Sequence, residues 1–256
     1  MRTTDFSSLL YRWMQLAGLD RTTITSLNFS TFRDFCNGRL EVMWKSDLWP
    51  DLIRITTPPG NTVTTDGYGV RSYQLDNTVG EVLGVYDDNP RLTTRARLLK
   101  YFLYEDSTGR YVNVMENTTP IFIEYRIVKT DLVGDLYDPT VSYQVGSQIY
   151  FDPSNPTGGQ YIPTAGTLSQ GNFYTCVSTS TGFSPLTAAQ NWQIIQIPYF
   201  MGEYLIRSSL ADYLRSEGQF EQSQLAESDA EGARELEVDR VLRQEGQIPR
   251  LNMFTY

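Results

Sequence analysis

Apolar positions at the start of the chain recur with the spacing of an α-helix. They fall at intervals of three and four residues, which places them on one helical face. Gly18 follows the last of them, and glycine is common just after a helix ends. A second helix is predicted from about Asn28 to Asp47, before Trp49-Pro50 closes the pattern. The two apolar sets are Phe6, Leu9, Leu10, Trp13, Met14 and Ala17, then Phe29, Phe32, Cys36, Leu40 and Met43.

Short β-like runs separated by turn residues replace this pattern after residue 53. The run Arg97–Tyr104 is apolar at both odd and even positions, so we expect a strand that lies in the centre of a sheet or at an interface. Glu105–Gly109 resembles a hairpin loop that leads into the next strand. The predicted strands are Ile53–Thr56, Val79–Tyr86, Arg97–Tyr104, Tyr111–Met115 and Ile121–Val128.

Residues 138–197 are rich in Gly, Pro, Ser and Thr and nearly free of charge, which predicts a small inserted β module. Helical patterns return at Pro198, over Tyr199–Arg215 and Phe220–Gln247. If the two late helices pack with the two early ones, the fold is α+β: a four-helix bundle scaffold with two β-rich insertions. The predicted domains are 1–52 with 198–256 for the helical scaffold and its C-terminal docking tail, 53–137 for the first insertion, and 138–197 for the second.

Composition narrows the classes of function. The 256 residues include no histidine, which removes Ser-His-Asp and Cys-His nucleophilic pairs and most zinc sites. We therefore expect no enzymatic activity and no cofactor. The spacing of Asp131, Asp135 and Asp138 fits no calcium loop, so we expect no metal site. Cys36 and Cys176 are far apart and are expected to be buried, reduced thiols.

The formal net charge of −9 argues against a protein that wraps nucleic acid, although DNA could still slide through a passive channel. No apolar run approaches the length that spans a membrane, and the first residues lead into an amphipathic pattern instead of a secretory signal. We therefore expect no membrane partner and synthesis inside a cell.

The last residues of the sequence form a short apolar segment after Pro249, which ends the preceding helical pattern. This segment is too short to build a core. It could fold back onto its own subunit, or it could dock on a neighbouring protein. Its apolar residues are Leu251, Met253, Phe254 and Tyr256.

The order of several short motifs along almost the whole chain resembles the head-to-tail adaptor (connector) proteins of tailed bacteriophages. The motifs are Leu16–Leu19, Trp44 with Asp47–Leu52, Val85-Tyr86 with Asn89–Arg91, Pro120–Arg126, Ala211–Arg215 with Gly218-Gln219, Gln244–Gln247 and Thr255-Tyr256.

The resemblance implies a virion structural protein that forms a homo-oligomeric ring, expected to be a dodecamer, beneath the portal protein. Its tail residues Leu251, Met253, Phe254 and Tyr256 would dock on the portal, and a downstream tail or nozzle protein would bind below. DNA would pass through the ring without sequence-specific binding. The implied location is the neck of the virion, at the head-tail interface, after synthesis in the host cytoplasm.

Acidic residues outnumber arginines nine to three between Glu217 and Glu245. One interpretation is a solvated helix face with ion pairs such as Glu231–Arg234 and Glu237–Arg240. The other is a channel lining, in which the like charges of Glu227, Glu231 and Glu235 keep the DNA from adhering.

Part of the second insertion resembles a chitin-binding-type module. The residues that carry the resemblance are Tyr143–Gly146, Ile149-Tyr150, Gly171–Val177, Gly182–Pro185 and Trp192, and the long Asp152–Thr167 segment departs from it. Tyr161 and Trp192 could stack on a sugar ring, or they could form the core of the module. The alternative function is therefore a carbohydrate-binding tail protein or a host-surface recognition protein.

Overall fold

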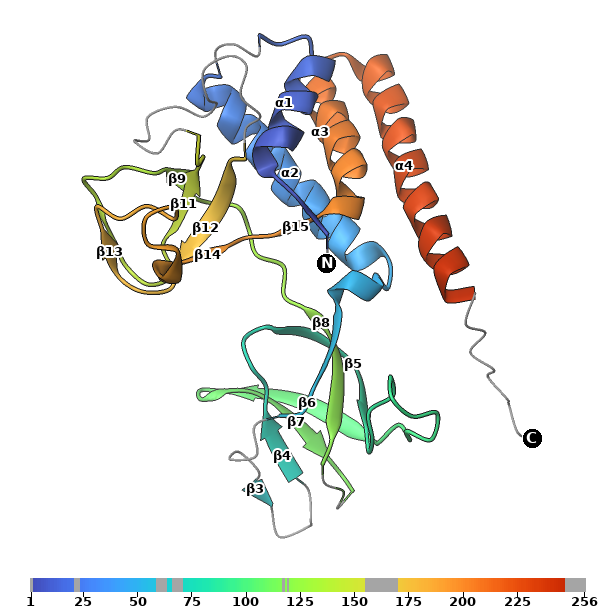
Figure 1. Ribbon diagram of the computed structural model, residues 1–256. Helices are drawn as coiled ribbons and strands as arrows, with labels where there is room; N and C mark the ends of the chain where they lie inside the picture. Colours follow the sequence, from blue (N-terminus) through green and yellow to red (C-terminus); the bar gives the residue numbers. More distant parts are fainter. Residues whose placement is uncertain are drawn as a thin grey trace. The chain divides into compact units, whose positions relative to one another are not determined.

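The computed structural model describes residues 2–20, 24–58, 64–65, 71–116, 118, 120–154 and 170–246 (Figure 1). The chain divides into two compact units. The first, here called the helical unit, comprises Met1–Asp47 and Thr130–Tyr256. The second, here called the β unit, comprises Leu48–Lys129.

The helices of the helical unit lie where the apolar periodicity predicts them. Thr25 starts the second helix by accepting a hydrogen bond from the Asn28 N–H through its side chain. Gly218 separates the last two helices with a φ of 77°, a left-handed conformation that a residue without Cβ adopts most easily. The helices are α1 (Phe6–Leu16), α2 (Ser26–Ser46), α3 (Gly202–Ser216) and α4 (Phe220–Gly246), and short 3₁₀ turns precede α3 at Tyr199–Met201 and β14 at Ala189–Asn191.

The helical unit also contains a four-stranded sheet in the order β14-β12-β11-β9. All neighbours in it are antiparallel except β9 and β11. Two further strand pairs, β1 with β15 and β10 with β13, complete the unit. The strands are β1 (Thr3–Thr4), β9 (Asp135–Leu136), β10 (Ser142–Tyr143), β11 (Gln148–Phe151), β12 (Asn172–Cys176), β13 (Ser180–Thr181), β14 (Trp192–Ile194) and β15 (Ile197–Pro198).

The predicted four-helix bundle scaffold with two β-rich insertions is wrong, because the fold is an α+β mixture in which a sheet supplies part of the helical core. The Phe6 ring of α1 lies 4.8 Å from the Phe173 ring of β12, and the Phe29 ring of α2 lies 4.8 Å from the Tyr150 ring of β11. Helix α4 contributes little apolar core: Ala230 and Ser223 are the buried residues among its described side chains. The aromatic faces of α1 and α2 are therefore covered by the sheet and α3.

The β unit encloses its own apolar core between two sheets. One sheet has the order β2-β8-β5 and the other β3-β4-β7-β6. Buried side chains from both sheets form one cluster, which includes Tyr73, Val82, Val112 and Ile123. The strands are β2 (Ile53–Thr56), β3 (Thr64–Thr65), β4 (Arg71–Gln74), β5 (Val79–Tyr86), β6 (Tyr101–Asp106), β7 (Gly109–Val114) and β8 (Phe122–Ile127), and a 3₁₀ turn at Pro50–Leu52 precedes them.

Most of the predicted strands of the β unit are close to those observed, with one informative difference. The doubly apolar run Arg97–Tyr104 contributes to β6, which begins at Tyr101 and ends at Asp106. Because β6 is the last strand of its sheet, a central position is wrong. The predicted hairpin to β7 is confirmed, with Asp106 paired to Gly109.

The contribution of the sheet to the helical core can be tested with Phe173→Ala. We expect the free energy of unfolding to fall by about 3–5 kcal/mol, as for other buried phenylalanines. Chemical denaturation followed by circular dichroism would measure it. Phe183→Ala is the matched control, because the Phe183 side chain is 57% exposed. Equal stability of the two variants would contradict a shared core.

Candidate functional site

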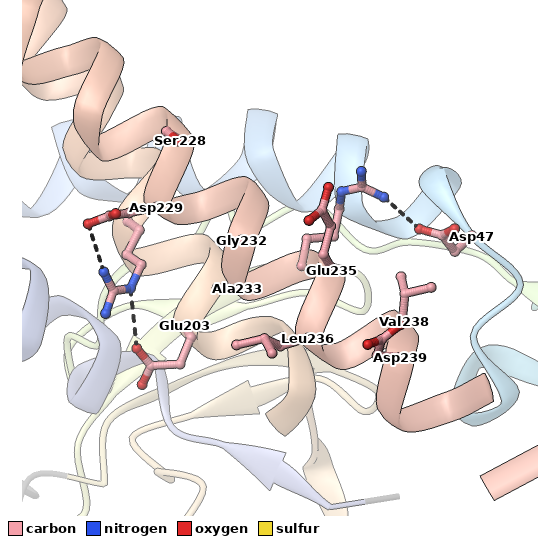
Figure 2. A pocket seen from close by; sticks show the side chains of 12 residues that line it. Asp47, Glu203, Ser228, Asp229, Gly232, Ala233, Glu235, Leu236, Val238 and Asp239 are labelled. Carbon is pink, nitrogen blue, oxygen red and sulfur yellow. Dashed lines mark hydrogen bonds and ion pairs between the residues drawn. The ribbon is translucent and has the colours of Figure 1, made fainter. Parts of the chain in front are cut away.

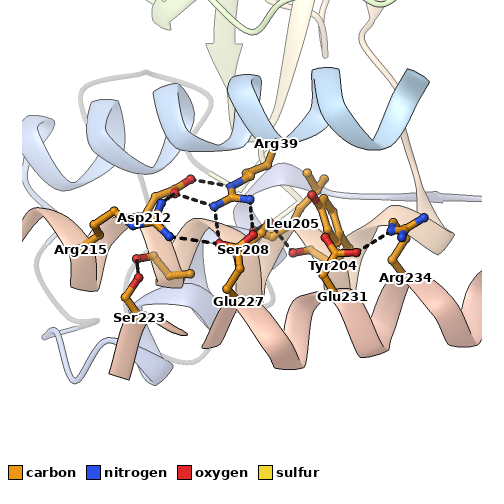
Figure 3. Close-up of polar contacts among 11 residues, drawn as sticks. Arg39, Tyr204, Leu205, Ser208, Asp212, Arg215, Ser223, Glu227, Glu231 and Arg234 are labelled. Carbon is orange, nitrogen blue, oxygen red and sulfur yellow. Dashed lines mark hydrogen bonds and ion pairs between the residues drawn. The ribbon is translucent and has the colours of Figure 1, made fainter. Parts of the chain in front are cut away.

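An ion cluster around Arg39 joins α2, α3 and α4 (Figure 3). The Arg39 guanidinium donates to both carboxylate oxygens of Asp212 on α3, each at 2.6 Å. It also donates to both oxygens of Glu227 on α4 at 2.6 Å. Arg215 lies 3.2 Å from Asp212 and 3.6 Å from Glu227. Two arginines therefore share two carboxylates across three helices.

Burial makes this cluster stronger than a surface ion pair. The Arg39 side chain is only 15% exposed and that of Glu227 is 29% exposed. The hydrogen bonds that Arg39 donates to Asp212 raise the pKa of Arg39 above its ordinary value, and those that it donates to Glu227 add to the effect, against the desolvation that lowers it. Arg39 therefore remains a cation at every physiological pH, and α4 stays attached to α2 by charge.

Two further ion pairs and one hydrogen bond also attach α4 to the helical unit. Arg207 on α3 lies 3.1 Å from Asp229, and Arg234 on α4 donates to Asp47 at 3.0 Å (Figure 2). The Ser223 hydroxyl donates to the Ala211 carbonyl at 2.8 Å, which brings the first turns of α4 against α3. These contacts, which are mainly polar, hold α4 between Ser223 and Arg234.

A shallow groove of about 1000 Å³ follows α4 near these ion pairs (Figure 2). Its lining includes Glu203, Arg207, Gly232, Ala233, Leu236 and Asp239. These side chains are charged, small or aliphatic. The groove therefore presents a mostly charged and aliphatic surface.

The side of α4 turned away from Ser223 and Ala230 carries exposed leucines. Successive residues of a helix rotate by about 100°, which places Leu225 and Leu236 on one stripe, about three turns apart. Their exposed fractions are 70% and 71%. Leu242 and Phe220 are also exposed, but in another direction around the helix. We call Leu225, Gly232 and Leu236 the outer stripe.

The three acidic residues predicted to line a channel occupy different environments. Glu227 belongs to the Arg39 cluster, and Glu231 accepts from Arg234 at 2.8 Å. Glu235 is exposed. The predicted ion pairs Glu231–Arg234 and Glu237–Arg240 are confirmed, each at 2.8 Å.

Arg39 itself was missed by reasoning from the sequence, although a signal exists. It follows Phe32 by seven residues and Cys36 by three, so it occupies a position of the apolar stripe of α2. An arginine in such a stripe is buried with its charge, and it therefore needs carboxylate partners.

Trp192 is 6% exposed and lies in the core of the small sheet with Tyr137, Ile149 and Phe151. Its indole N–H donates to the Phe183 carbonyl at 3.1 Å, which satisfies the one polar atom of the ring. Tyr161 and the tail residues Leu251, Met253, Phe254 and Tyr256 lie outside the described residues.

Several other expectations can be compared with the described part of the chain. Neither Cys36 nor Cys176 forms a disulfide, and both are buried, as predicted. None of the described helices is both long enough and apolar enough to cross a membrane. The described residues contain no group of three or more carboxylate or cysteine side chains that could hold a metal ion.

No model of a known protein family matches this sequence, and no curated protein sequence matches it at a significant level.

The Arg39 cluster can be tested with Arg39→Met, which keeps the length of the side chain and removes its charge. Asp212 and Glu227 would then lose their main partner, and we expect a loss of about 1–3 kcal/mol in the free energy of unfolding. Amide hydrogen exchange should accelerate in α4 more than in α1.

Arg12→Met is the matched control, because Arg12 pairs with Glu203 at a position where its side chain is 53% exposed. Unchanged exchange in α4 of the Arg39 variant would show that the cluster does not hold this helix.

Proposed function

We propose that this chain is the subunit of a homo-oligomeric ring that acts as a head-to-tail adaptor in the neck of a tailed bacteriophage. The ordered motifs from Leu16–Leu19 to Thr255-Tyr256 support this proposal through their resemblance to adaptor proteins. The ring is expected to be a dodecamer beneath the portal protein, with a tail or nozzle protein below it. Catalysis forms no part of the proposal.

The observation that carries the proposal is the incomplete packing of α4. This helix has 27 residues; Ser223, Glu227 and Arg234 hold one side of it, while Leu225 and Leu236 on the other side are exposed. Burying apolar surface contributes about 25 cal/mol per Å², so a contact in which a neighbouring subunit covers the outer stripe would be stabilised. In a ring, each subunit can offer this stripe to the next one.

The charge of α4 fits a channel for DNA if the helix also borders the lumen. Glu227 and Glu231 are neutralised by Arg39 and Arg234, so they would repel phosphate weakly. Glu235 is exposed and would repel DNA phosphate more strongly. The charge balance favours passage of DNA without adhesion and without sequence-specific binding.

Docking on the portal through Leu251, Met253, Phe254 and Tyr256 remains part of the proposal on the strength of the resemblance. The carbohydrate-binding alternative gains no specific support from the described residues. The indole ring of Trp192 is occupied by core contacts, so it offers no exposed face on which a sugar could stack.

Labelled particles test the location. Val145 is 66% exposed, whereas both native cysteines are buried, so a thiol-reactive gold label would select Val145→Cys. We expect the label at the junction of capsid and tail in electron micrographs. Label at the distal end of the tail, or absence of the protein from particles, would overturn the proposal.

The role of the outer stripe is tested with Leu236→Lys. Charges repeated around the subunit contact should stop ring formation, while the monomer stays folded because Leu236 is exposed. Native mass spectrometry of the assembled neck complex would report the loss. Leu242→Lys is the control, since it points about 120° away around the same helix. Normal rings with Leu236→Lys would exclude this stripe as the contact.

The proposed lumenal charge is tested with Glu235→Lys. Attraction to DNA phosphate should slow genome ejection several-fold at low ionic strength, and salt should reverse the effect. Glu227→Lys should instead weaken folding, because it places a cation beside Arg39. Time-resolved fluorescence of released DNA measures the rate. Equal ejection rates for Glu235→Lys and the unmodified protein at low salt would place Glu235 outside the channel.

A further inference from the structure

Strand β6 is an edge strand with apolar side chains on both faces. It pairs with β7 on one side, and the described residues place no strand on its other side. Phe102 and Tyr104 point to one face and Leu103 to the opposite face, because side chains alternate along a strand. Their exposed fractions are 44%, 36% and 45%. An exposed apolar edge of this kind is a template for pairing with another strand.

The hydrogen bonds around β6 identify which backbone groups face outward. The Lys100 carbonyl accepts from the Met115 N–H at 3.3 Å, on the side of β7. The Leu99 N–H donates to the Val85 carbonyl at 2.8 Å, on the opposite side. Since these directions alternate along a strand, Tyr101, Leu103 and Glu105 present their N–H and C=O groups on the outer side.

We propose that two copies of this chain pair through β6, antiparallel, with Leu103 of one copy opposite Leu103 of the other. In this register Lys100 lies opposite Asp106 of the second copy, at both ends of the contact. Phe102 lies opposite Tyr104 of the second copy, also twice. The outward groups of Tyr101 then bond to Glu105, and those of Leu103 bond to Leu103.

Charge complementarity and cross-strand packing favour this partner. Opposite charges and aromatic pairs placed directly opposite each other stabilise a sheet by about 0.2–1 kcal/mol each. The Asp106 carboxylate accepts hydrogen bonds from the side chain and the backbone N–H of Thr108, which lower its pKa and keep it anionic. Lys100 is exposed and can reach it.

Neighbouring registers give β6 poorer backbone hydrogen bonds or poorer side-chain pairs. A twofold axis requires paired residues to lie on the same face, so the register can shift only in steps that keep odd residues opposite odd residues. A shift in one direction requires the outward N–H of Leu99, which already donates to the Val85 carbonyl. A shift in the other direction places Phe102 opposite Asp106. The register centred on Leu103 avoids both conflicts.

This contact differs in kind from the proposed ring contact. A twofold contact closes on a pair, whereas a ring repeats a head-to-tail contact. The pairing therefore describes the free protein, and it does not rest on the proposed function. The two contacts use different units of the chain, so the failure of one leaves the other standing.

Cysteine cross-linking of the full-length protein tests the register. In the proposed pair the Leu103 Cα atoms are about 5.5 Å apart, within the reach of a disulfide. Mild oxidation of Leu103→Cys should give a covalent dimer, because the native Cys36 and Cys176 are buried. Phe102→Cys alone should cross-link poorly, and a mixture of Phe102→Cys with Tyr104→Cys should cross-link well.

Sedimentation velocity supplies the second test. The unmodified protein should sediment as a dimer, and Leu103→Pro should raise the dissociation constant at least tenfold. Proline removes an N–H that faces outward and leaves the bonds to β7 in place, as edge strands tolerate. Circular dichroism would confirm that this variant is folded. Lys100→Asp is a second variant, which weakens only the terminal charge pairs and leaves the backbone unchanged. A monomeric unmodified protein, or cross-linking that ignores the register, would overturn the proposal.

Discussion

The Arg39 cluster decides which side of α4 faces the rest of the helical unit. Helix α4 has little apolar surface to orient it, because Ala230 and Ser223 are the buried residues among its described side chains. A guanidinium that is largely removed from water needs carboxylate partners, and Arg39 pairs with Asp212 on α3 and Glu227 on α4. The rotation of α4 follows from these bonds. With Glu227 turned inward, Leu225 and Leu236 are turned outward.

The aromatic cluster at the start of the chain explains why the helices do not form a self-contained bundle. Phe6 contacts Phe29, Tyr150 and Phe173, so residues from two helices and two strands share one core. The strands β11 and β12 therefore contribute side chains to the core of the helical unit. Trp192 belongs to the same small sheet but is buried in a separate cluster with Tyr137, Ile149 and Phe151.

The two exposed apolar features imply different modes of association. The outer stripe of α4 is a helical surface bordered by charges, suited to a side-by-side contact between subunits. The edge of β6 offers backbone hydrogen bonds in a self-complementary sequence, suited to a pair. Together the proposals assign association of the free form and association of the assembled form to separate units of the chain.

Local sequence patterns were sufficient to locate the secondary structure. Periodicity located α1 to α4 and most of the strands of the β unit, because local patterns of burial follow helical and strand geometry. The absence of histidine and the pairs Glu231–Arg234 and Glu237–Arg240 also follow directly from the sequence. A periodic pattern states which residues are buried, but it does not state what covers them.

Which elements and side chains contact each other depends on the packing of the whole chain. The pairing of Arg39 with Asp212 joins residues far apart in the sequence, and no local spacing encodes it. The doubly apolar run around Phe102 predicted burial on both faces, yet strand order placed it at an edge. Tertiary packing likewise placed a sheet, and not α4, over Phe6 and Phe29. Apolar surface is buried without directional preference, so only the packing of the whole chain selects the elements that meet.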